Sequence, residues 1–299
     1  MPDHSTVKKS PSSGLTPEDK NRFLAQGYLH VREAIPQSLV TELSEKIDTY
    51  ASDRSDKAQN RVDIFGMDRA FLELTDLDTI LPKIQGLLGD NIWINHSHIN
   101  RNPTTSTKRK FGYSWHRDGG AVIEDLPSPV PLVFIKVGFY LSDLSEPNRG
   151  QTFILPGSHH SSAPPPPSPK RPAEAIPLNT RPGDAILFDF RTIHSLQSPN
   201  HSDMIRRAVF IQYGYRWIQP FSDCTFAEGS NPLSPVRRQL LGLTTTKSNL
   251  AGTAADRSGV FYPTPEDIPL HEFPPTPKRE NVILRAARRA ARTIRRRPF

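Results

Sequence analysis

The spacing of apolar residues changes along this chain, and the change limits the folds that the chain can adopt. From about residue 91 to residue 215, short runs rich in β-branched and aromatic residues alternate with Pro, Gly, Asn and Asp. Such runs are typical of strands, and the residues between them favour turns. Short strands at short intervals indicate an antiparallel sheet that closes or stacks on another, as in a jelly roll. We predict strands over 92–100, 133–141, 152–155, 185–188 and 208–213.

Helical signals flank this region on both sides. Thr16, Pro17 and the two acids that follow are typical of a helix start. This helix is expected to change into a short strand within residues 23–32, through Gly27. The fold class is therefore predicted to be mainly β with flanking helices. Further helices are predicted from Pro36 onwards, over 76–88 and over 234–241.

The domain organisation follows from these elements and from the composition around them. The chain has 299 residues, which is long enough for a sizeable core. The proline-rich segment 161–172 is expected to form an extended, exposed loop. We predict a leader without fixed structure over 1–15, one domain over 16–243, an irregular linker over 244–277 and a basic tail over 278–299 that can be helical.

The positive charge of the chain is concentrated at one end. The formal net charge is +7, and residues 278–299 contain nine Lys or Arg and one Glu, a sum of +8, so the remainder carries −1. A nearly neutral body makes nucleic acid an improbable partner of the folded part. The tail is interpreted as a solvated extension, although nucleic acid, an acidic lipid surface or an acidic protein remain alternatives for it.

Cysteine content and hydropathy indicate the cellular compartment in which the protein is expected. Cys224 is the single cysteine, which excludes a disulfide within the chain and a zinc site built from several thiolates. No apolar run reaches about 18 residues, so we predict no membrane span. The first residues also lack the apolar stretch of a secretory signal. A cytoplasmic location is therefore expected.

The segment around His116 and Asp118 is the first candidate site. Residues two apart in a strand project to the same face, so these side chains can bind one ion together. Imidazole and carboxylate without thiolate suit Fe(II) when a second His completes the ligand set. The pair alone is weak evidence, since an ion pair at the rim of a sheet explains it as well.

Two later residues strengthen this interpretation. His194 follows a turn and a buried strand, where a third ligand from the same sheet is expected. Arg206 comes twelve residues later, at the start of another apolar strand. Arginine suits a bidentate grip on a carboxylate, and neighbouring arginines in a strand face opposite sides. Only one of Arg206 and Arg207 can therefore point inward, and we prefer Arg206.

In the order and spacing of its motifs, the chain resembles the phytanoyl-CoA dioxygenase family of Fe(II)- and 2-oxoglutarate-dependent enzymes over roughly residues 17–242. The matching pieces are Phe23–Tyr28, His116-Arg117-Asp118, Leu141-Ser142-Asp143, Gly150 through Leu155–His159, Pro182-Gly183-Asp184, His194 and Arg206–Ala208. The resemblance implies a double-stranded β-helix (jelly-roll, cupin-like) core. It also implies His116, Asp118 and His194 as ligands of iron and Arg206 as the residue that binds the 2-oxoglutarate tail.

The resemblance suggests further pocket residues with weaker support. Asn100 and Arg61 match positions that contact 2-oxoglutarate in some members. His98, Phe139 and Trp115 are expected to line the pocket. Leu196 departs from the family, where some members have a hydroxyl residue.

The expected activity follows from the ligand set. Related halogenases lack the carboxylate ligand, whereas this chain keeps Asp118, so the resemblance implies oxidation, most simply hydroxylation. The expected cofactors are Fe(II), 2-oxoglutarate and O₂, with succinate and CO₂ as by-products. The substrate is expected to be a small molecule of specialised metabolism. The alternative is a non-catalytic, metal-binding jelly-roll protein whose basic tail engages an acidic partner.

Overall fold

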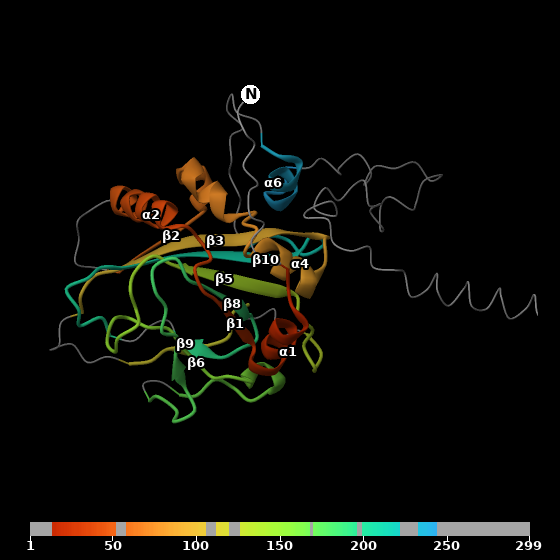
Figure 1. Cartoon of the computed structure of the whole chain (residues 1–299). Helices are drawn as coiled ribbons and strands as arrows, with labels where there is room; N and C mark the ends of the chain where they lie inside the picture. Colours follow the sequence, from red (N-terminus) through yellow and green to blue (C-terminus); the bar gives the residue numbers. More distant parts are fainter. Residues whose placement is uncertain are drawn as a thin grey trace, which may run out of the picture.

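Two antiparallel sheets form the body of the protein in the computed structural model (Figure 1). The structure describes residues 14–51, 58–105, 112–119, 126–167, 170–195, 199–221 and 233–243. The larger sheet contains, in spatial order, β1 (Tyr28–Val31), β8 (Ala185–Asp189), β5 (Phe134–Tyr140), β10 (Arg206–Tyr215), β3 (Ile92–Asn102) and β2 (Gln59–Val62). The smaller sheet contains β4 (Trp115–His116), β9 (His194–Ser195), β6 (Phe153–Ile154) and β7 (Ile176–Pro177). The predicted mainly antiparallel β architecture is confirmed.

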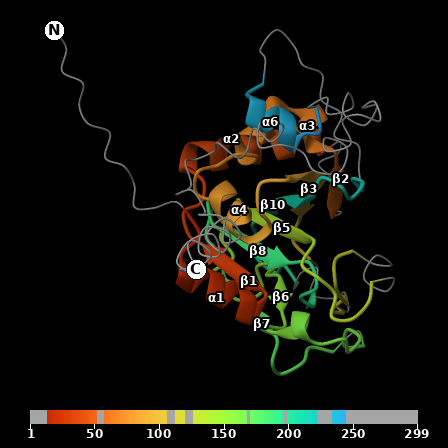
Figure 2. The ribbon, with the colours of Figure 1, turned by 90° about the vertical axis from the view of Figure 1, so that its right-hand side faces the viewer.

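Helices α2, α3 and α6 cover the face of the larger sheet that lies away from the smaller sheet, whereas α1 lies beside β1. Figures 1 and 2 place α2, α3 and α6 above the larger sheet and β6 below it. The helices are α1 (Pro17–Gln26), α2 (Gln37–Tyr50), α3 (Ile64–Met67), α4 (Leu81–Leu88) and α6 (Pro235–Leu240), with 3₁₀ turns η1 (Arg69–Leu74) and η2 (Ser158–His160). None of the helices in these described segments is long and apolar enough to cross a membrane.

The predicted third helix begins later than expected. The sequence predicts a helix over 76–88, but α4 begins at Leu81. Before it, the backbone makes a turn in which Ile80 N–H donates to the Leu77 carbonyl at 3.0 Å. Pro82 occupies the first turn of α4, where its missing N–H is not needed. The helical turns α3 and η1, within residues 64–74, were not predicted.

Alternation along the central strands separates two cores. In β10, Val209, Ile211 and Tyr213 belong to the core that the larger sheet shares with α2 and α4. Ala208 and Phe210 instead pack in a second core that includes Ile154 of the smaller sheet. Side chains of successive strand residues point to opposite faces, so the even-numbered positions of β10 face the interior between the sheets.

The proline-rich loop departs in part from its predicted role. Most of its described residues are exposed, as expected. The loop nevertheless lies against the smaller sheet, because Arg117 donates to the carbonyls of Ser161 and Ala163 and Trp115 Nε1 donates to that of Lys170. Residues 1–13 and 244–299, which hold most of the predicted leader and all of the linker and tail, lie outside the described residues. The domain boundaries stay predictions.

Gly27 joins α1 to β1 at a crowded point. Its φ of 80° is left-handed, and its carbonyl accepts hydrogen bonds from Thr192 Oγ1 at 3.0 Å and Asp189 N–H at 2.9 Å. An added Cβ would collide with Thr192 Oγ1 and His159 Nδ1. Gly157 has a similar φ of 77°, but its added Cβ would have only the Ala25 carbonyl within reach, at 3.7 Å.

We expect Gly27→Ala to destabilise the fold more than Gly157→Ala. The left-handed backbone costs about 1 kcal/mol in both variants. Overpacking against Thr192 and His159 should bring the loss at Gly27 to about 2–4 kcal/mol. Urea denaturation of both variants measures the difference, and equal losses would show that crowding at Gly27 is unimportant.

Candidate metal centre

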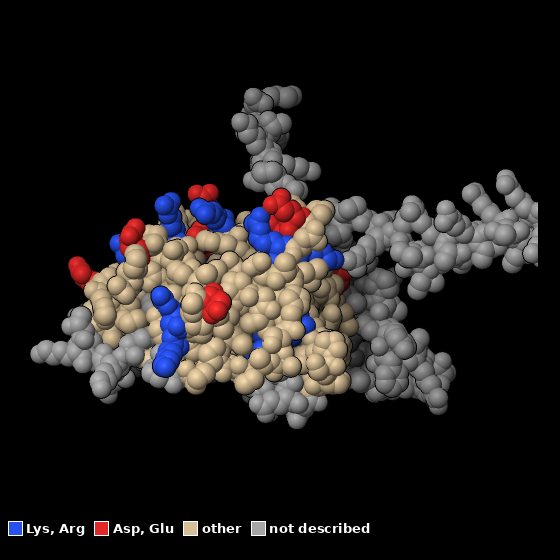
Figure 3. All heavy atoms as spheres, turned by 90° about the horizontal axis from the view of Figure 1, so that it is seen from below, with Lys and Arg blue, Asp and Glu red and all other residues tan. Residues whose placement is uncertain are grey.

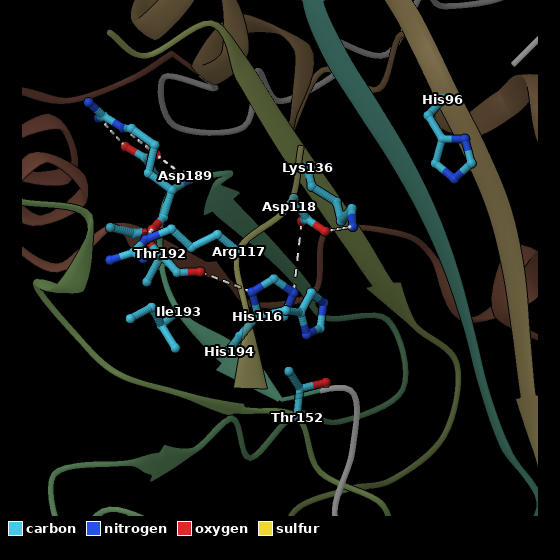
Figure 4. Close-up of polar contacts among 12 residues, drawn as sticks. His96, His116, Arg117, Asp118, Lys136, Thr152, Asp189, Thr192, Ile193 and His194 are labelled. Carbon is cyan, nitrogen blue, oxygen red and sulfur yellow. Dashed lines mark hydrogen bonds and ion pairs between the residues drawn. The ribbon is translucent and has the colours of Figure 1, made fainter. Parts of the chain in front are cut away.

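The pairing of β4 with β9 brings His116 opposite His194. The two residues are direct partners in the antiparallel register, and their ring centroids lie 4.3 Å apart. Asp118 follows in a turn, where its N–H donates to the Phe190 carbonyl at 2.9 Å. Among the described residues, these three form the only group of His, Cys, Asp and Glu that could hold a metal ion, with ligand atoms within 4.8 Å of one another (Figure 4).

Arg117 anchors the segment from the opposite side. Its Nε donates to the Arg191 carbonyl at 2.8 Å, and its other nitrogens donate to carbonyls of the proline-rich loop. Because alternate residues of an extended segment face opposite sides, Arg117 fixes the backbone while His116 and Asp118 point inward.

Both imidazoles present the same nitrogen to the centre. His116 Nδ1 lies 3.0 Å from the Ser114 carbonyl, and His194 Nδ1 lies 3.0 Å from the Thr192 carbonyl. A carbonyl only accepts, so each Nδ1 carries the proton and each Nε2 keeps its lone pair. Burial lowers the pKa of His194 to about 4, although the charge of Asp118 acts in the opposite direction. Hydrogen bonds from the ring nitrogen that does not bind the metal fix the ring orientation of metal-binding histidines.

The two oxygens of Asp118 have different surroundings. Oδ1 accepts a hydrogen bond from Lys136 Nζ at 2.6 Å. Oδ2 is buried and has no hydrogen-bond partner within the described part of the chain, and it lies 3.8 Å from His194 Nε2. Burial raises the pKa of Asp118, but the charges of Lys136 and His194 outweigh it, so the pKa lies well below its ordinary value.

These features fit a divalent metal ion. A buried carboxylate oxygen without a partner is costly unless a cation or donor meets it. Two imidazole lone pairs and this oxygen converge on one point, and the set contains no thiolate. A set of two His and one carboxylate with open positions is the one used by non-haem Fe(II) oxygenases.

Arg206 is buried in the interior between the two sheets. Its side chain is among the largest fully buried ones, and its Nη atoms donate to Asn100 Oδ1 and, at 3.4 Å, to Thr152 Oγ1. Arg207 points outward, where its Nη2 pairs with Asp48 at 2.6 Å. Arg206 and Arg207, which are adjacent in β10, thus point to opposite faces of the sheet.

The guanidinium of Arg206 has no acid beside it among the described residues. Its Nε is buried without a hydrogen-bond partner among these residues, and its Cζ lies 5.7 Å from the centroid of the Tyr140 ring. Burial lowers the pKa of Arg206. A buried cation without a counter-charge is unfavourable, so the surroundings of Arg206 suit an anionic ligand such as a carboxylate.

Two of the weaker predicted pocket residues face this interior. Asn100 hydrogen-bonds to Arg206 and also accepts from Asn102 Nδ2. His98 stacks on Phe210 with ring centroids 4.8 Å apart, and burial lowers its pKa to about 3. Both lie on the inner face of β3, beside inward positions of β10.

Three other predicted pocket residues do not face it. Arg61 pairs with Ile99 in the register of β2 and β3, so it shares the outer face of that residue and not the inner face of Asn100. Phe139 is fully buried in the core beneath the helices. Trp115 packs with Phe153 and Ile193 on the outer side of the smaller sheet. In each case the alternation of strand side chains turns the residue away from this interior.

Sequence reasoning missed Lys136, Tyr140 and Thr152. Lys136 contacts a predicted ligand, and the other two residues contact Arg206. A signal for Lys136 was present, because it is the only charged residue in the apolar strand β5. Nothing in the sequence singles out Thr152, which lies just before β6.

Comparison with protein families identifies the group to which this architecture belongs. A family model for phytanoyl-CoA dioxygenase (PhyH) matches residues 23–208, which is more than half of the chain. The chain belongs to this family. Its matched segment includes the three candidate ligands and Arg206. Among curated proteins, none matches the chain significantly.

Several solved structures have a similar fold. HygX from Streptomyces hygroscopicus, with nickel and 2-oxoglutarate bound, has a TM-score of 0.58 at 15% identity, covering 70% of this chain and 91% of its own. The non-heme alpha ketoglutarate dependent epimerase SnoN from nogalamycin biosynthesis has a TM-score of 0.54 at 20% identity, covering 74% and 95%. The carbocyclase SnoK from the same biosynthesis has a TM-score of 0.53 at 18% identity, covering 69% and 86%. At this identity the likeness shows the shared fold.

We expect His194→Ala to reduce the affinity for Ni²⁺ by at least about 100-fold, because it removes a ligand outright. His159→Ala is the matched control, since His159 is equally buried at 8% exposure but bonds the Leu24 carbonyl. Calorimetric titration of both variants under anaerobic conditions measures the affinity. Equal affinity in the His194 variant and the wild type would exclude His194 as a ligand.

Proposed function

We propose that this chain is an Fe(II)- and 2-oxoglutarate-dependent dioxygenase that oxidises, most simply hydroxylates, a small organic substrate and releases succinate and CO₂. The proposal rests on two features that occur together. Three converging ligand atoms lie in the same barrel interior as a buried arginine that has no acid beside it in the described part of the chain. A cosubstrate that chelates the metal at one end and carries a carboxylate at the other satisfies both.

Each residue has a defined task in this proposal. His116 and His194 would hold Fe(II) through Nε2, and Asp118 would hold it through Oδ2. Arg206 would bind the distal carboxylate of 2-oxoglutarate, with Asn100 and Thr152 orienting the guanidinium. When bound, iron and 2-oxoglutarate turn O₂ into an oxidant of C–H bonds, and the protein supplies orientation and a dry surrounding.

A small molecule is the proposed substrate class. HygX has also been crystallised with hygromycin B, and SnoK and SnoN belong to nogalamycin biosynthesis. By analogy we propose a substrate from specialised metabolism. The face drawn in Figure 3 carries basic and acidic side chains beside one another, with other residues over most of it. That face offers no broad basic surface of the kind that nucleic acid requires. The cytoplasmic setting stays a prediction.

The non-catalytic alternative depends on the basic tail, whose residues 278–299 lie outside the described part. Removing them distinguishes the two hypotheses. An oxygenase keeps its turnover without the tail, whereas a tail-driven binder loses its partner and the salt dependence of that binding.

The direct test of the proposal is succinate release. We expect iron-loaded protein supplied with 2-oxoglutarate and O₂ to form succinate slowly without substrate, and faster with a true substrate in a mass-spectrometric screen of metabolites. The Asp118→Ala variant is expected to form none above background, because the metal loses a ligand and its only negative charge from the described protein residues. Protein that binds neither iron nor 2-oxoglutarate would refute the proposal.

We expect Arg206→Ala to weaken 2-oxoglutarate binding by about 30-fold or more, since a buried charged hydrogen-bond partner contributes at least about 2 kcal/mol. Arg207→Ala changes the neighbouring arginine on the outer face and should leave the affinity within about twofold. Titration of 2-oxoglutarate into Ni²⁺-loaded variants compares them. The same loss in both variants would show that the direction of Arg206 is irrelevant to the cosubstrate.

A further inference from the structure

Lys136 is a charged side chain in an apolar strand. Its neighbours in β5 are Phe, Ile, Val, Gly and Tyr, and only 13% of its side chain is exposed. It points inward with Tyr140, because both occupy even positions of the strand, and it ends at Asp118 (Figure 4). Within the described part of the chain, Asp118 is the only acid that pairs with Lys136.

The pair fixes which oxygen of Asp118 is available. The backbone N–H of Asp118 is tied to Phe190, and Oδ1 is held by Lys136 Nζ at 2.6 Å. Oδ2 remains without a partner and lies on the side of His194. Turning the carboxylate so that both oxygens meet a metal would break a charge-assisted hydrogen bond in a buried place, where such bonds are strong.

The number of Asp118 oxygens that bind the metal decides whether a position remains for O₂. Three protein ligand atoms leave half of the positions around an octahedral ion open. A 2-oxo acid that chelates through its ketone and carboxylate takes two of these positions and leaves one. A second oxygen from Asp118 would fill that last position.

We propose that Lys136 is a positioning residue that retains Asp118 Oδ1, keeps this ligand monodentate and so leaves a position on the metal for O₂. The inference rests on the proposed function of the site. It gives a reason for a lysine that is otherwise unfavourable, since its positive charge beside a divalent cation opposes metal binding. If the role of Lys136 were to strengthen metal binding, its positive charge would work against that role.

The test uses nitric oxide as a stand-in for O₂ on the anaerobic Fe(II)–2-oxoglutarate form of the full chain. We expect Lys136→Met to bind Fe(II) at least as tightly as the wild type, because a repelling charge is gone. Its affinity for nitric oxide, followed by electron paramagnetic resonance, should fall by about tenfold or more. Lys136→Arg keeps a charged donor and should recover most of the loss.

The matched control is Lys46→Met, which breaks another Lys–Asp pair. Lys46 Nζ lies 2.7 Å from Asp68, and the side chain is 38% exposed. This variant should bind nitric oxide as the wild type does. Lys136→Leu, whose side chain suits a buried strand, repeats the measurement if the Met variant folds poorly, and circular dichroism monitors folding.

Three outcomes separate the hypotheses. Unchanged nitric oxide affinity in folded, iron-loaded Lys136→Met would overturn the positioning role. Loss of Fe(II) binding in that variant would also overturn it and assign Lys136 to metal affinity. If the wild type itself binds neither Fe(II) nor 2-oxoglutarate, the proposed function fails as a whole, and the two failures are thereby distinguished.

Discussion

The antiparallel register between β4 and β9 is the constraint on which the site depends. It places His116 beside His194, although 77 residues lie between them in the chain. A slip of one residue would place Ser195 opposite His116 in place of His194. In the observed register Ser195 pairs with Trp115 and shares its outer face. The register is held because each face has its own packing, with Ile154 inside and Phe153 outside on the adjoining strand.

The barrel interior combines apolar walls with a few buried charges. Asp118 and Lys136 compensate each other, while Arg206 has only neutral partners among the described residues. Burying a lone guanidinium lowers the stability of the fold, and a fold tolerates it where a ligand restores the balance. The same low dielectric that makes Arg206 costly strengthens its attraction for a carboxylate. A site of this kind is therefore most stable when it is occupied.

Much of the site could be predicted because strand alternation is local. The pairing of His116 with Asp118, and the expectation that only one of Arg206 and Arg207 points inward, follow from which neighbours share a face. The same rule could not place Arg61 or Phe139, because which face of a strand turns inward depends on the strands beside it. For Trp115 the rule already points outward, since its neighbour His116 points inward. β2 takes its direction from the register with β3, in which Arg61 stands beside Ile99. Lys136 was missed because its significance lies in a contact with Asp118, in the turn after β4.

The sequence alone determined the class of fold, the ligand types and the family resemblance, because turn residues, alternation and motif spacing are written along the chain. The tertiary structure decided which oxygen of Asp118 is free, which nitrogen of each imidazole faces the centre and which arginine lacks an acid beside it. Each imidazole is oriented by the carbonyl two residues before it, but the two imidazoles meet only because β4 pairs with β9. The other two properties depend on contacts between residues apart in sequence, Asp118 with Lys136 and Thr152 with Arg206. Their distances are set by sheet register and core packing, and neither can be calculated from local propensity.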